Sequence, residues 1–371
     1  MAVITNKWTG TEYFNIFDFS HIEYYVGNAK QSLYYYCLVM GFKVFAYKGP
    51  ETGNKDFSSY VLKKNKIFII LTSPVKSTHK SNDWINKHGD GIYDIAFIVD
   101  NARDAYESCI SRGAESSYSP ICNNNKTYST AGIKTYGDVI HSFVSKDDFE
   151  GVWAPGFEKI IEPNLNVLDT GIIKIDHVVG NVEENKMNYW RDYYENIFGF
   201  TNFIVFDDLD ISTKYSSLKS RVMRSKNWKI RLPINEPANG LKKSQIQEYL
   251  DFNNGPGVQH VAFLTNDISN TICTLRNNGM EFLGVPNTYY DELDTRVGPI
   301  DENINLLKEL NILVDRDEEG YLLQLFSKPV QNRPTLFYEF IQRKGSRGFG
   351  QGNFQALFES IEREQKIRGN L

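Results

Sequence analysis

The chain has 371 residues, which is more than one hydrophobic core usually serves, so we expect two domains of ordinary size. Its formal net charge of -5 argues against a nucleic-acid-binding protein, because such a protein needs a basic face to neutralise phosphates. No stretch reaches the apolar length of a membrane span, and the first residues lack the pattern of a signal peptide, so we expect a soluble, cytoplasmic protein. The four cysteines are far apart, which favours reduced thiols over a disulfide framework or a zinc knuckle.

An internal repeat organises the chain. His21 begins a short motif that ends in Val-Gly-Asn, and His177 begins a similar one; a helix-like run follows each of them. Further along, residues 89–97 parallel residues 255–263, and residues 111–115 parallel residues 277–281. This duplication predicts two copies of one ancestral fold.

Each half alternates short apolar runs with amphipathic patches. Residues 67–71 form an apolar run typical of a buried strand, whereas the large apolar residues between 187 and 197 fall on one face of a helix. This alternation predicts an α+β fold with helices packed outside the strands. Proline, glycine and asparagine cluster between residues 154 and 166, so we predict domains at 1–158 and 159–371.

The two halves differ in the residues that could bind a metal. Asp94 matches His260 in the repeat, and Phe157 matches Glu339 when residues are counted from Lys146 and Lys328. Only His21 then remains in the first half as a counterpart of His177. We therefore predict that residues 1–158 form a degenerate, structural domain without metal, and that residues 159–371 carry the chemistry.

Three residues of the second half are candidate metal ligands. Glu339 stands in an aromatic, strand-like run, where an unpaired carboxylate would be costly, so we expect a cation or strong donors beside it. His177 and His260 lie in similar apolar runs. Two imidazoles and one carboxylate are the ligand set of non-heme iron(II) oxygenases, but the same set also holds catalytic zinc. Ligand type alone leaves both metals open.

The last residues predict a helix that could act as a lid. From the candidate N-cap Asn353, apolar residues follow at positions 354, 357, 358 and 361, which places them on one helix face. Glycines at 345, 348, 350 and 352 precede this helix and could form a hinge. A helix packed permanently on the core fits the same pattern.

Several segments, from about Phe17 to Leu371, carry a resemblance to a known family. They are residues 26–30, 136–138, 215–218, 233–237, 243–247, 257–260, 322–324 and 348–354. At these segments the sequence resembles the 4-hydroxyphenylpyruvate dioxygenases. The resemblance implies the vicinal oxygen chelate fold: two tandem domains of paired βαβββ modules, with a curled sheet around a metal site in the C-terminal domain.

The resemblance also implies a reaction and its site. The family converts an aromatic 2-oxo acid and O2 to homogentisate and CO2 in tyrosine and phenylalanine catabolism, by oxidative decarboxylation, ring hydroxylation and side-chain migration. It implies one Fe(2+) per chain, held by His177, His260 and Glu339, and a homodimer. The residues implied to line the substrate pocket are Gln245, Gln259, Gln324, Ser220, Asn235, Phe326, Phe349 and Phe354.

Alternatives remain open for the pocket and for the activity. Gln245 follows the predicted N-cap Ser244, so it could be an exposed first-turn residue, and Phe326 could be ordinary core. Hydroxymandelate synthases share the fold, the iron and the substrate but hydroxylate the benzylic carbon. Extradiol ring cleavage needs a further acid-base histidine, which the second half lacks. A metal-free binding module on the same fold is a different class of function.

Overall fold

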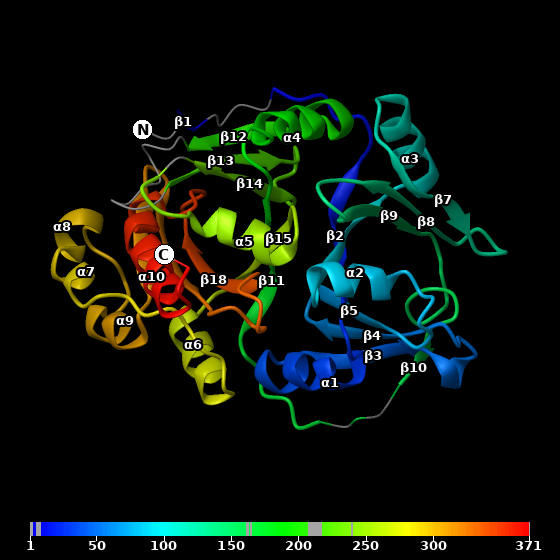
Figure 1. The fold of residues 1–371 in the computed structure, drawn as a ribbon, viewed down its shortest axis with the longest axis horizontal. Coiled ribbons are helices and arrows are strands. Elements are labelled where there is room, and N and C mark those ends of the chain that lie inside the picture. The colour runs from blue at the N-terminus through cyan, green and yellow to red at the C-terminus, as the bar shows by residue number, and fades with distance from the viewer. Residues whose placement is uncertain are drawn as a thin grey trace.

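The computed structural model describes residues 3–4, 9–160, 163, 165–206, 217–238 and 240–370. Two mixed β-sheets of nine strands each form the frame of the protein, and helices pack against them (Figure 1). This is the predicted α+β architecture. Residues 161, 162 and 164 of the predicted linker lie outside the described ranges.

The first sheet is built from residues 16–159. Its strands are β2 (Ile16–Tyr25), β3 (Lys43–Lys48), β4 (Phe57–Lys64), β5 (Ile67–Pro74), β6 (Gly91–Val99), β7 (Ser116–Cys122), β8 (Tyr128–Lys134), β9 (Ile140–Lys146) and β10 (Glu158–Lys159). They lie in the order β10-β3-β4-β5-β2-β6-β9-β8-β7.

The second sheet uses the second half of the chain and one short strand from its start. Its strands are β1 (Val3–Ile4), β11 (Ile172–Asn181), β12 (Thr201–Phe206), β13 (Ser217–Arg224), β14 (Arg231–Ala238), β15 (Gly257–Thr265), β16 (Leu313–Asp317), β17 (Gly320–Phe326) and β18 (Phe337–Lys344). They lie in the order β1-β12-β13-β14-β11-β15-β18-β17-β16.

Helices α1, α2 and α3 of the first half have counterparts in α4, α5 and α6 of the second half. In the first half the helices are α1 (Ala29–Tyr34), α2 (Ser81–His88) and α3 (Ala102–Ser111); in the second they are α4 (Met187–Tyr193), α5 (Gln245–Asn253), α6 (Ile268–Asn277), α7 (Thr288–Asp291), α8 (Leu293–Val297), α9 (Ile304–Leu310) and α10 (Phe354–Ile367). Both α1 and α4 continue into a π-helical turn, at Tyr35–Val39 and Tyr194–Phe198.

The strand orders confirm the internal repeat. β2 to β9 of the first sheet take the same relative places as β11 to β18 of the second. Even the β-bulges recur: the pairing of β2 with β6 shifts between Phe19 and His21, and the pairing of β11 with β15 shifts between Ile175 and His177. A bulge bends the strand and re-aims the side chain beside it.

The register corrects one detail of the sequence alignment. Ala262 pairs with Glu339 in the second sheet, and Asp94 pairs with Ile140 in the first, so the position equivalent to Glu339 is Ser142 rather than Phe157. Counting from Lys146 failed because Lys146 ends β9, whereas its presumed counterpart Lys328 follows β17.

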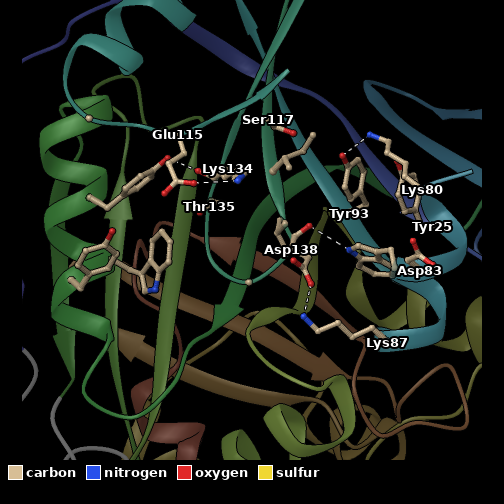
Figure 2. A pocket seen from close by; sticks show the side chains of 18 residues that line it. Tyr25, Lys80, Asp83, Lys87, Tyr93, Glu115, Ser117, Lys134, Thr135 and Asp138 are labelled. Atoms are coloured by element: carbon tan, nitrogen blue, oxygen red, sulfur yellow. Dashed lines mark hydrogen bonds and ion pairs between the residues drawn. The ribbon is translucent and has the colours of Figure 1, made fainter. Parts of the chain in front are cut away.

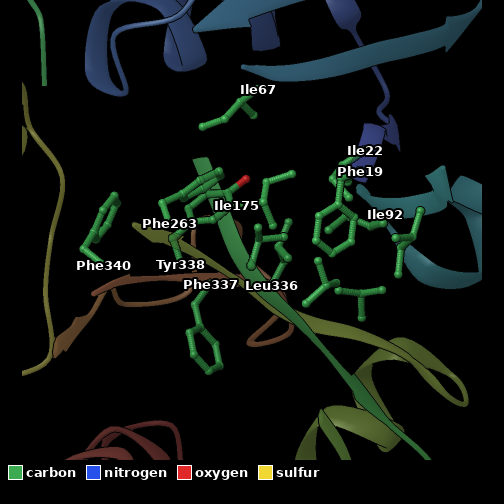
Figure 3. Packing of buried hydrophobic residues seen from close by; sticks show 14 of the residues in the cluster. Phe19, Ile22, Ile67, Ile92, Ile175, Phe263, Leu336, Phe337, Tyr338 and Phe340 are labelled. Carbon is green, nitrogen blue, oxygen red and sulfur yellow. The ribbon is translucent and has the colours of Figure 1, made fainter. Parts of the chain in front are cut away.

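A hydrophobic core joins the two halves. Figure 3 shows Phe19, Ile22 and Ile92 of the first sheet packed in one cluster with Phe263 and other buried residues of the second. Within that core, the hydroxyl oxygens of Tyr36 and Tyr338 lie 2.8 Å apart in a hydrogen bond. The second sheet therefore packs against the first through this shared core.

Each sheet ends in a short strand from a distant part of the sequence. β1 pairs with β12 in the second sheet, and β10 pairs with β3 in the first. Thr201 Oγ1 also accepts hydrogen bonds from the backbone of Thr9 and Gly10, at 3.3 and 3.0 Å. The described helices include none that is both long and apolar enough to cross a membrane.

Candidate metal centre and cavity

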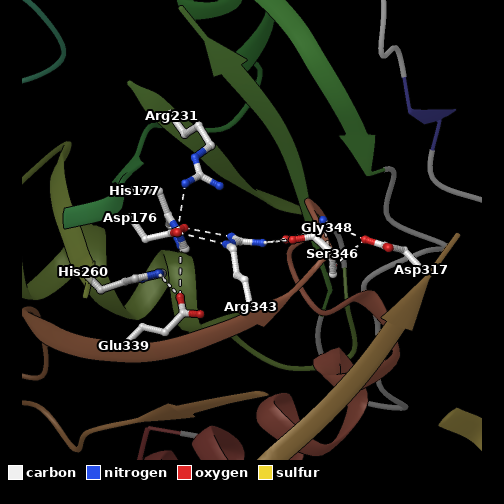
Figure 4. Close-up of polar contacts among 9 residues, drawn as sticks. All are labelled: Asp176, His177, Arg231, His260, Asp317, Glu339, Arg343, Ser346 and Gly348. Atoms are coloured by element: carbon white, nitrogen blue, oxygen red, sulfur yellow. Dashed lines mark hydrogen bonds and ion pairs between the residues drawn. The ribbon is translucent and has the colours of Figure 1, made fainter. Parts of the chain in front are cut away.

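The structure brings the three predicted ligands together. His177 lies on β11, His260 on β15 and Glu339 on β18, and all three are buried. The Nε2 atoms of His177 and His260 lie 3.0 and 3.4 Å from the same oxygen, Oε2 of Glu339 (Figure 4). Nitrogen and oxygen atoms that converge so closely could bind one metal ion.

Sheet geometry explains why they meet. β15 lies between β11 and β18, and its residue His260 pairs with Val179 on one side and with Phe337 on the other. Alternate residues of a strand share a face, so His177, His260 and Glu339 project from three adjacent strands toward one point. The bulge before His177 adjusts the aim of its ring.

A buried ion-pair network fixes the imidazole of His177. Asp176 Oδ1 lies 2.8 Å from His177 Nδ1. The same carboxylate accepts hydrogen bonds from Arg231 at 2.9 Å and from Arg343 at 2.8 and 2.9 Å. With Nδ1 engaged in this way, Nε2 is left for the ligand position. His260 is held similarly, because its Nδ1 lies 3.0 Å from Gln259 Oε1.

The protonation of the group follows from burial and charge. Burial alone would raise the pKa of Glu339, but His177 and then His260 hold that pKa at about 2. Burial lowers the pKa of His260. Burial opposes ionisation of Asp176 as well, yet Arg231 and Arg343 keep its pKa well below the usual range. Glu339 is therefore ionised in an apolar setting, which suits a cation, whereas Arg231 and Arg343 already pair with the charge of Asp176.

A cavity opens beside the ligands. The predicted residues that line it are His177, His260, Glu339, Ser220, Asn235, Gln245, Gln259, Phe326, Phe349 and Phe354. Ser244 caps α5 as predicted, its Oγ accepting from the backbone N–H of Gln247 at 3.1 Å, and Gln245 is the first residue of that helix. Gln245 is nevertheless buried, so it is not the exposed first-turn residue of the alternative. The apolar wall also includes residues that sequence reasoning missed, namely Val179, Phe206, Leu218, Val222, Pro233, Phe337, Leu357 and Phe358.

Gln324 is the one predicted pocket residue placed differently. It is not among the residues that line the cavity; it is fully buried and packs against the backbone of Gly350. Both its Nε2 and its Oε1 lack a hydrogen-bond partner within the described part of the chain. A buried amide in this condition is costly unless a ligand or water satisfies it.

The sequence also did not predict the ion-pair network of Asp176 with Arg231 and Arg343. Asp176 and Arg343 are 167 residues apart, so their pairing could not be predicted from local pattern. A signal was nevertheless available, because Asp176 is an acidic residue inside an apolar run, as Glu339 is. The same reasoning that selected Glu339 would have selected Asp176 as a buried, partnered carboxylate.

A larger cavity of about 630 Å³ lies elsewhere, between the first sheet and α4 (Figure 2). None of the predicted site residues lines it. Its lysines are engaged: Lys87 pairs with Asp138 at 2.7 Å, and Lys134 pairs with Glu115 at 3.2 Å. It holds no group of metal-ligating side chains within the described residues.

Comparison with known proteins places the chain in a family. The Glyoxalase/Bleomycin resistance protein/Dioxygenase superfamily matches residues 18–128 and 174–325, one match in each half. A 4-hydroxyphenylpyruvate dioxygenase from Tetrahymena thermophila is 43% identical over 368 residues, covering 95% of this chain and 91% of the relative. The chain belongs to the 4-hydroxyphenylpyruvate dioxygenase family. A family member from Neurospora crassa is 42% identical, covering 97% of this chain and 94% of the relative.

A solved structure supports the vicinal oxygen chelate fold expected of the 4-hydroxyphenylpyruvate dioxygenase family. A mutant of 4-hydroxymandelate synthase from Streptomyces coelicolor superposes with a TM-score of 0.84 at 30% identity. The match covers 94% of this chain and 99% of that one, so both domains are shared. The predicted fold is confirmed.

Proposed function

We propose that this chain is a non-heme iron(II) dioxygenase that converts 4-hydroxyphenylpyruvate and O2 to homogentisate and CO2. The observation that carries the proposal is the buried group of His177, His260 and Glu339, which faces a cavity of aromatic walls and amide side chains. Incubation of the iron-loaded protein with 4-hydroxyphenylpyruvate, with O2 uptake and product identity measured, tests it. Absence of coupled homogentisate formation would contradict it.

The donor set fits the metal that the proposal requires. The two imidazole nitrogens of His177 and His260 and the carboxylate of Glu339 would hold the ion and would leave positions for small ligands. One iron(II) per chain bound there would supply the redox chemistry that couples reduction of O2 to loss of CO2 from the 2-oxo acid. Elemental analysis of the purified protein distinguishes iron from zinc, because both suit these ligands.

The side chains of the cavity would position the substrate. Gln245, Gln259 and Asn235 offer amide donors and acceptors, and Ser220 offers a hydroxyl, on a mostly apolar surface. These groups can bind the polar ends of an aromatic 2-oxo acid while Phe326 and other aromatic rings hold its ring. Because apolar walls surround the site, they also keep water away from the reaction.

The helix α10 is proposed as a lid over this cavity. Phe354, Leu357 and Phe358 on one face of α10 form part of the wall, and the cavity beneath them measures about 80 Å³. Pockets that bind a ligand are usually several hundred Å³ in size, so this cavity has to widen to hold the substrate, and movement of α10 is proposed to provide the room. Asn353 precedes the helix as predicted, but its side chain does not cap it; Oδ1 accepts instead from the Tyr289 hydroxyl at 2.6 Å.

The contacts at the two ends of α10 suit a lid that is held over the cavity. At its start, Gly350 has a φ of 76°, and a side chain there would lie 2.3 Å from Gln324 Nε2, so only glycine fits. At its far end, Arg368 makes two hydrogen bonds to the buried carboxylate of Glu248 on α5, at 2.8 and 3.2 Å. The ion pair between Arg368 and Glu248 therefore holds α10 in its place over the cavity.

Deletion of residues 352–371 is expected to leave a folded protein that still binds iron. It should consume O2 slowly or without forming homogentisate, because the cavity loses one wall and admits water. The measurement compares O2 consumed with homogentisate formed. The matched control is Lys366→Ala, an exposed position on the same helix. Full coupled activity after the deletion would mean that the helix is only structural.

Gln324→Ala is expected to keep the iron but to lower productive turnover. Because its amide has no partner among the described residues, we propose that it hydrogen-bonds the substrate or a water beside it, and loss of that contact should raise the barrier by roughly 1–3 kcal/mol and release uncoupled product such as hydroxyphenylacetate. Gln259→Ala should lower turnover similarly, and it should also weaken iron binding because Gln259 Oε1 supports His260. Steady-state kinetics and iron titration separate the two effects. Unchanged kinetics in both variants would remove these amides from the proposed site.

Two finer points belong to the same proposal. Benzylic hydroxylation, the reaction of hydroxymandelate synthases, is the rival outcome; product analysis decides between hydroxymandelate and homogentisate. We also expect a homodimer, which size-exclusion chromatography with light scattering would test.

A further inference from the structure

The cavity of about 630 Å³ lies away from the proposed iron site, and both halves of the chain contribute to its walls (Figure 2). The first half contributes α2, the ends of β2 and β6, and residues between 113 and 140; the second half contributes α4. Cavities that bind small molecules usually measure about 300–1,000 Å³, so this one has the size of a ligand site. It shares no lining residue with the cavity beside Glu339 and would be a separate site.

Aromatic side chains line this cavity on both of its contributing parts. On the first half, the rings of Tyr25 and Tyr93 stack with their centroids 4.0 Å apart, and Trp84 meets Tyr25 edge to face at 5.7 Å. On the second half, the lining residues are Tyr189, Trp190 and Tyr193 of α4. Ring pairs are stabilised in stacked and edge-to-face arrangements, so these walls favour a ligand that carries an aromatic ring.

The charged residues of the cavity differ in their pairing. Four of them form two ion pairs, with N–O distances of 2.7 and 3.2 Å: Lys87 with Asp138, and Lys134 with Glu115. The other two, Lys80 and Asp83, form no ion pair within the described residues. Lys80 Nζ donates instead to the Tyr93 hydroxyl at 2.7 Å and lies 4.7 Å from the centre of that ring. The cavity therefore presents one cation and one carboxylate that lack ionic partners.

Two buried acids lie within electrostatic reach of Lys80 but leave its charge available. Burial raises the pKa of Glu23, and it raises the pKa of Asp94 to about 8, in both cases against the opposing effect of Lys80. Asp94 is therefore mostly protonated at neutral pH. Neither acid forms an ion pair with Lys80 among the described residues.

The two unpaired charges lie close together. Lys80 and Asp83 are three residues apart at the start of α2, and residues at this spacing are neighbours on a helix, with Cβ atoms about 5–6 Å apart. Both side chains are exposed, and Figure 2 shows them on the side of the cavity that also carries Tyr25 and Tyr93. An α-amino acid carries its carboxylate and its ammonium group on one carbon atom, so a single molecule can contact both charges.

We propose that this cavity binds a free aromatic amino acid. The carboxylate of the ligand would bind Lys80 Nζ, its ammonium group would bind the carboxylate of Asp83, and its ring would pack against the aromatic side chains of the cavity. Each charge of the ligand then meets an opposite charge. An aromatic 2-oxo acid lacks the cation that Asp83 would bind, so the site distinguishes its ligand from the proposed substrate of the iron site.

A ligand in this cavity would act on the second domain through α4. The backbone N–H of Met187, at the start of α4, donates to Oε2 of the buried Glu236 at 3.0 Å. Glu236 lies on β14 next to Asn235, which lines the proposed iron cavity. At the other end of α4, the Tyr193 hydroxyl donates to the carbonyl of Lys134 at 2.7 Å. Helix α4 thus connects the two cavities, and the first half of the chain gains a role in binding a small molecule.

Isothermal titration calorimetry of the full-length, iron-loaded protein with L-phenylalanine tests the proposal. One molecule per chain is expected to bind. Two analogues probe the two charges, because 3-phenylpropanoate lacks the ammonium group and phenethylamine lacks the carboxylate. Each should bind at least roughly 10-fold more weakly, since each leaves one charge of the site without a partner. Equal affinity for L-phenylalanine and 3-phenylpropanoate would contradict the role of Asp83.

Lys80→Met with Asp83→Asn should weaken the binding of L-phenylalanine by at least roughly 10-fold. The matched control is Lys76→Met with Asp56→Asn, an exposed ion pair of 2.6 Å on the same domain that does not line the cavity. That control should bind like the native protein. Glu339→Ala should also bind like the native protein, because the proposed iron is not part of this site, so failure of the iron proposal would leave this result unchanged.

Tryptophan fluorescence provides a second measurement, because Trp84 and Trp190 line the cavity. L-phenylalanine does not absorb where tryptophan is excited, so its binding should appear as a change in protein emission. Trp84→Phe with Trp190→Phe should lose that change. Absence of binding to the native protein would overturn the proposal. Undiminished binding to the Lys80→Met, Asp83→Asn protein would also overturn it, because the amino acid would then occupy another site.

Discussion

Glu339→Gln is expected to abolish turnover and to remove the iron. The amide keeps the size of the carboxylate but removes the negative charge that both imidazoles face, at 3.0 and 3.4 Å. His177→Ala and His260→Ala should have the same result, because each removes one of three protein ligands. The loss should exceed the roughly 10- to 100-fold that removal of outer partners of a metal site typically costs.

Iron retained after dialysis and O2 uptake are the measurements. His141→Gln is a suitable control, because His141 is also a fully buried histidine but is bound to the Ile95 carbonyl and the Tyr194 hydroxyl, away from the site. That variant should lose stability and keep its iron. Normal iron content together with normal O2 uptake in Glu339→Gln would refute the ligand assignment.

Asp176→Asn is expected to destabilise the whole protein as well as the metal site. Arg231 and Arg343 would keep their charges in a buried setting with no carboxylate between them (Figure 4). Breaking a buried ion pair from one side typically costs about 3–5 kcal/mol. Loss of the contact to His177 Nδ1 should also weaken iron binding by roughly 10- to 100-fold. Urea unfolding and iron titration measure the two effects.

A second aspartate provides the control for Asp176. Asp251 pairs with Lys243 at 2.7 Å, and the two side chains are 42% and 46% exposed. Asp251→Asn should therefore cost less than about 1 kcal/mol, as exposed ion pairs usually do. If Asp176→Asn cost no more than Asp251→Asn, the network would not be a source of stability. The prediction would then have to be abandoned.

The effect of Asp176 should extend to the mouth of the cavity. Arg343 Nη1 donates to the carbonyl oxygens of Ser346 and Gly348, at 3.2 and 2.7 Å, in the segment that leads to Phe349. Asp176 thus connects the imidazole of His177 with the hinge of the proposed lid through a single guanidinium group. A disturbed hinge in Asp176→Asn should appear as O2 consumption that is poorly coupled to product.

The sequence predicted the ligands because their signals are local. An isolated acid or imidazole in an apolar strand demands a partner, and the internal repeat showed which half kept such residues. The curled sheet and the pocket residues came from the family resemblance. Residues such as Gln245 could not be assigned to the pocket from spacing, since an exposed first turn of a helix fits the same pattern.

What the sequence could not predict depends on contacts between distant residues. The pairing of Asp176 with Arg343 and the exact register of β9 and β18 belong to this class, and the register error produced the false match with Phe157. The place of Gln324, beside Gly350 rather than on the cavity wall, depends on how the chain turns before α10. Backbone turns of this kind are set by tertiary packing more than by local preference.

The pairing of β1 with β12 has a consequence for how the protein is made. β1 is synthesised about 200 residues before its partner β12, which ends at Phe206. At about 5–20 residues per second, that partner is synthesised roughly 10–40 s after β1. The first sheet can close during this interval because its own last strand, β10, comes from the residues that follow β9. β1 must meanwhile stay unpaired, and this segment of the nascent chain would be open to a chaperone.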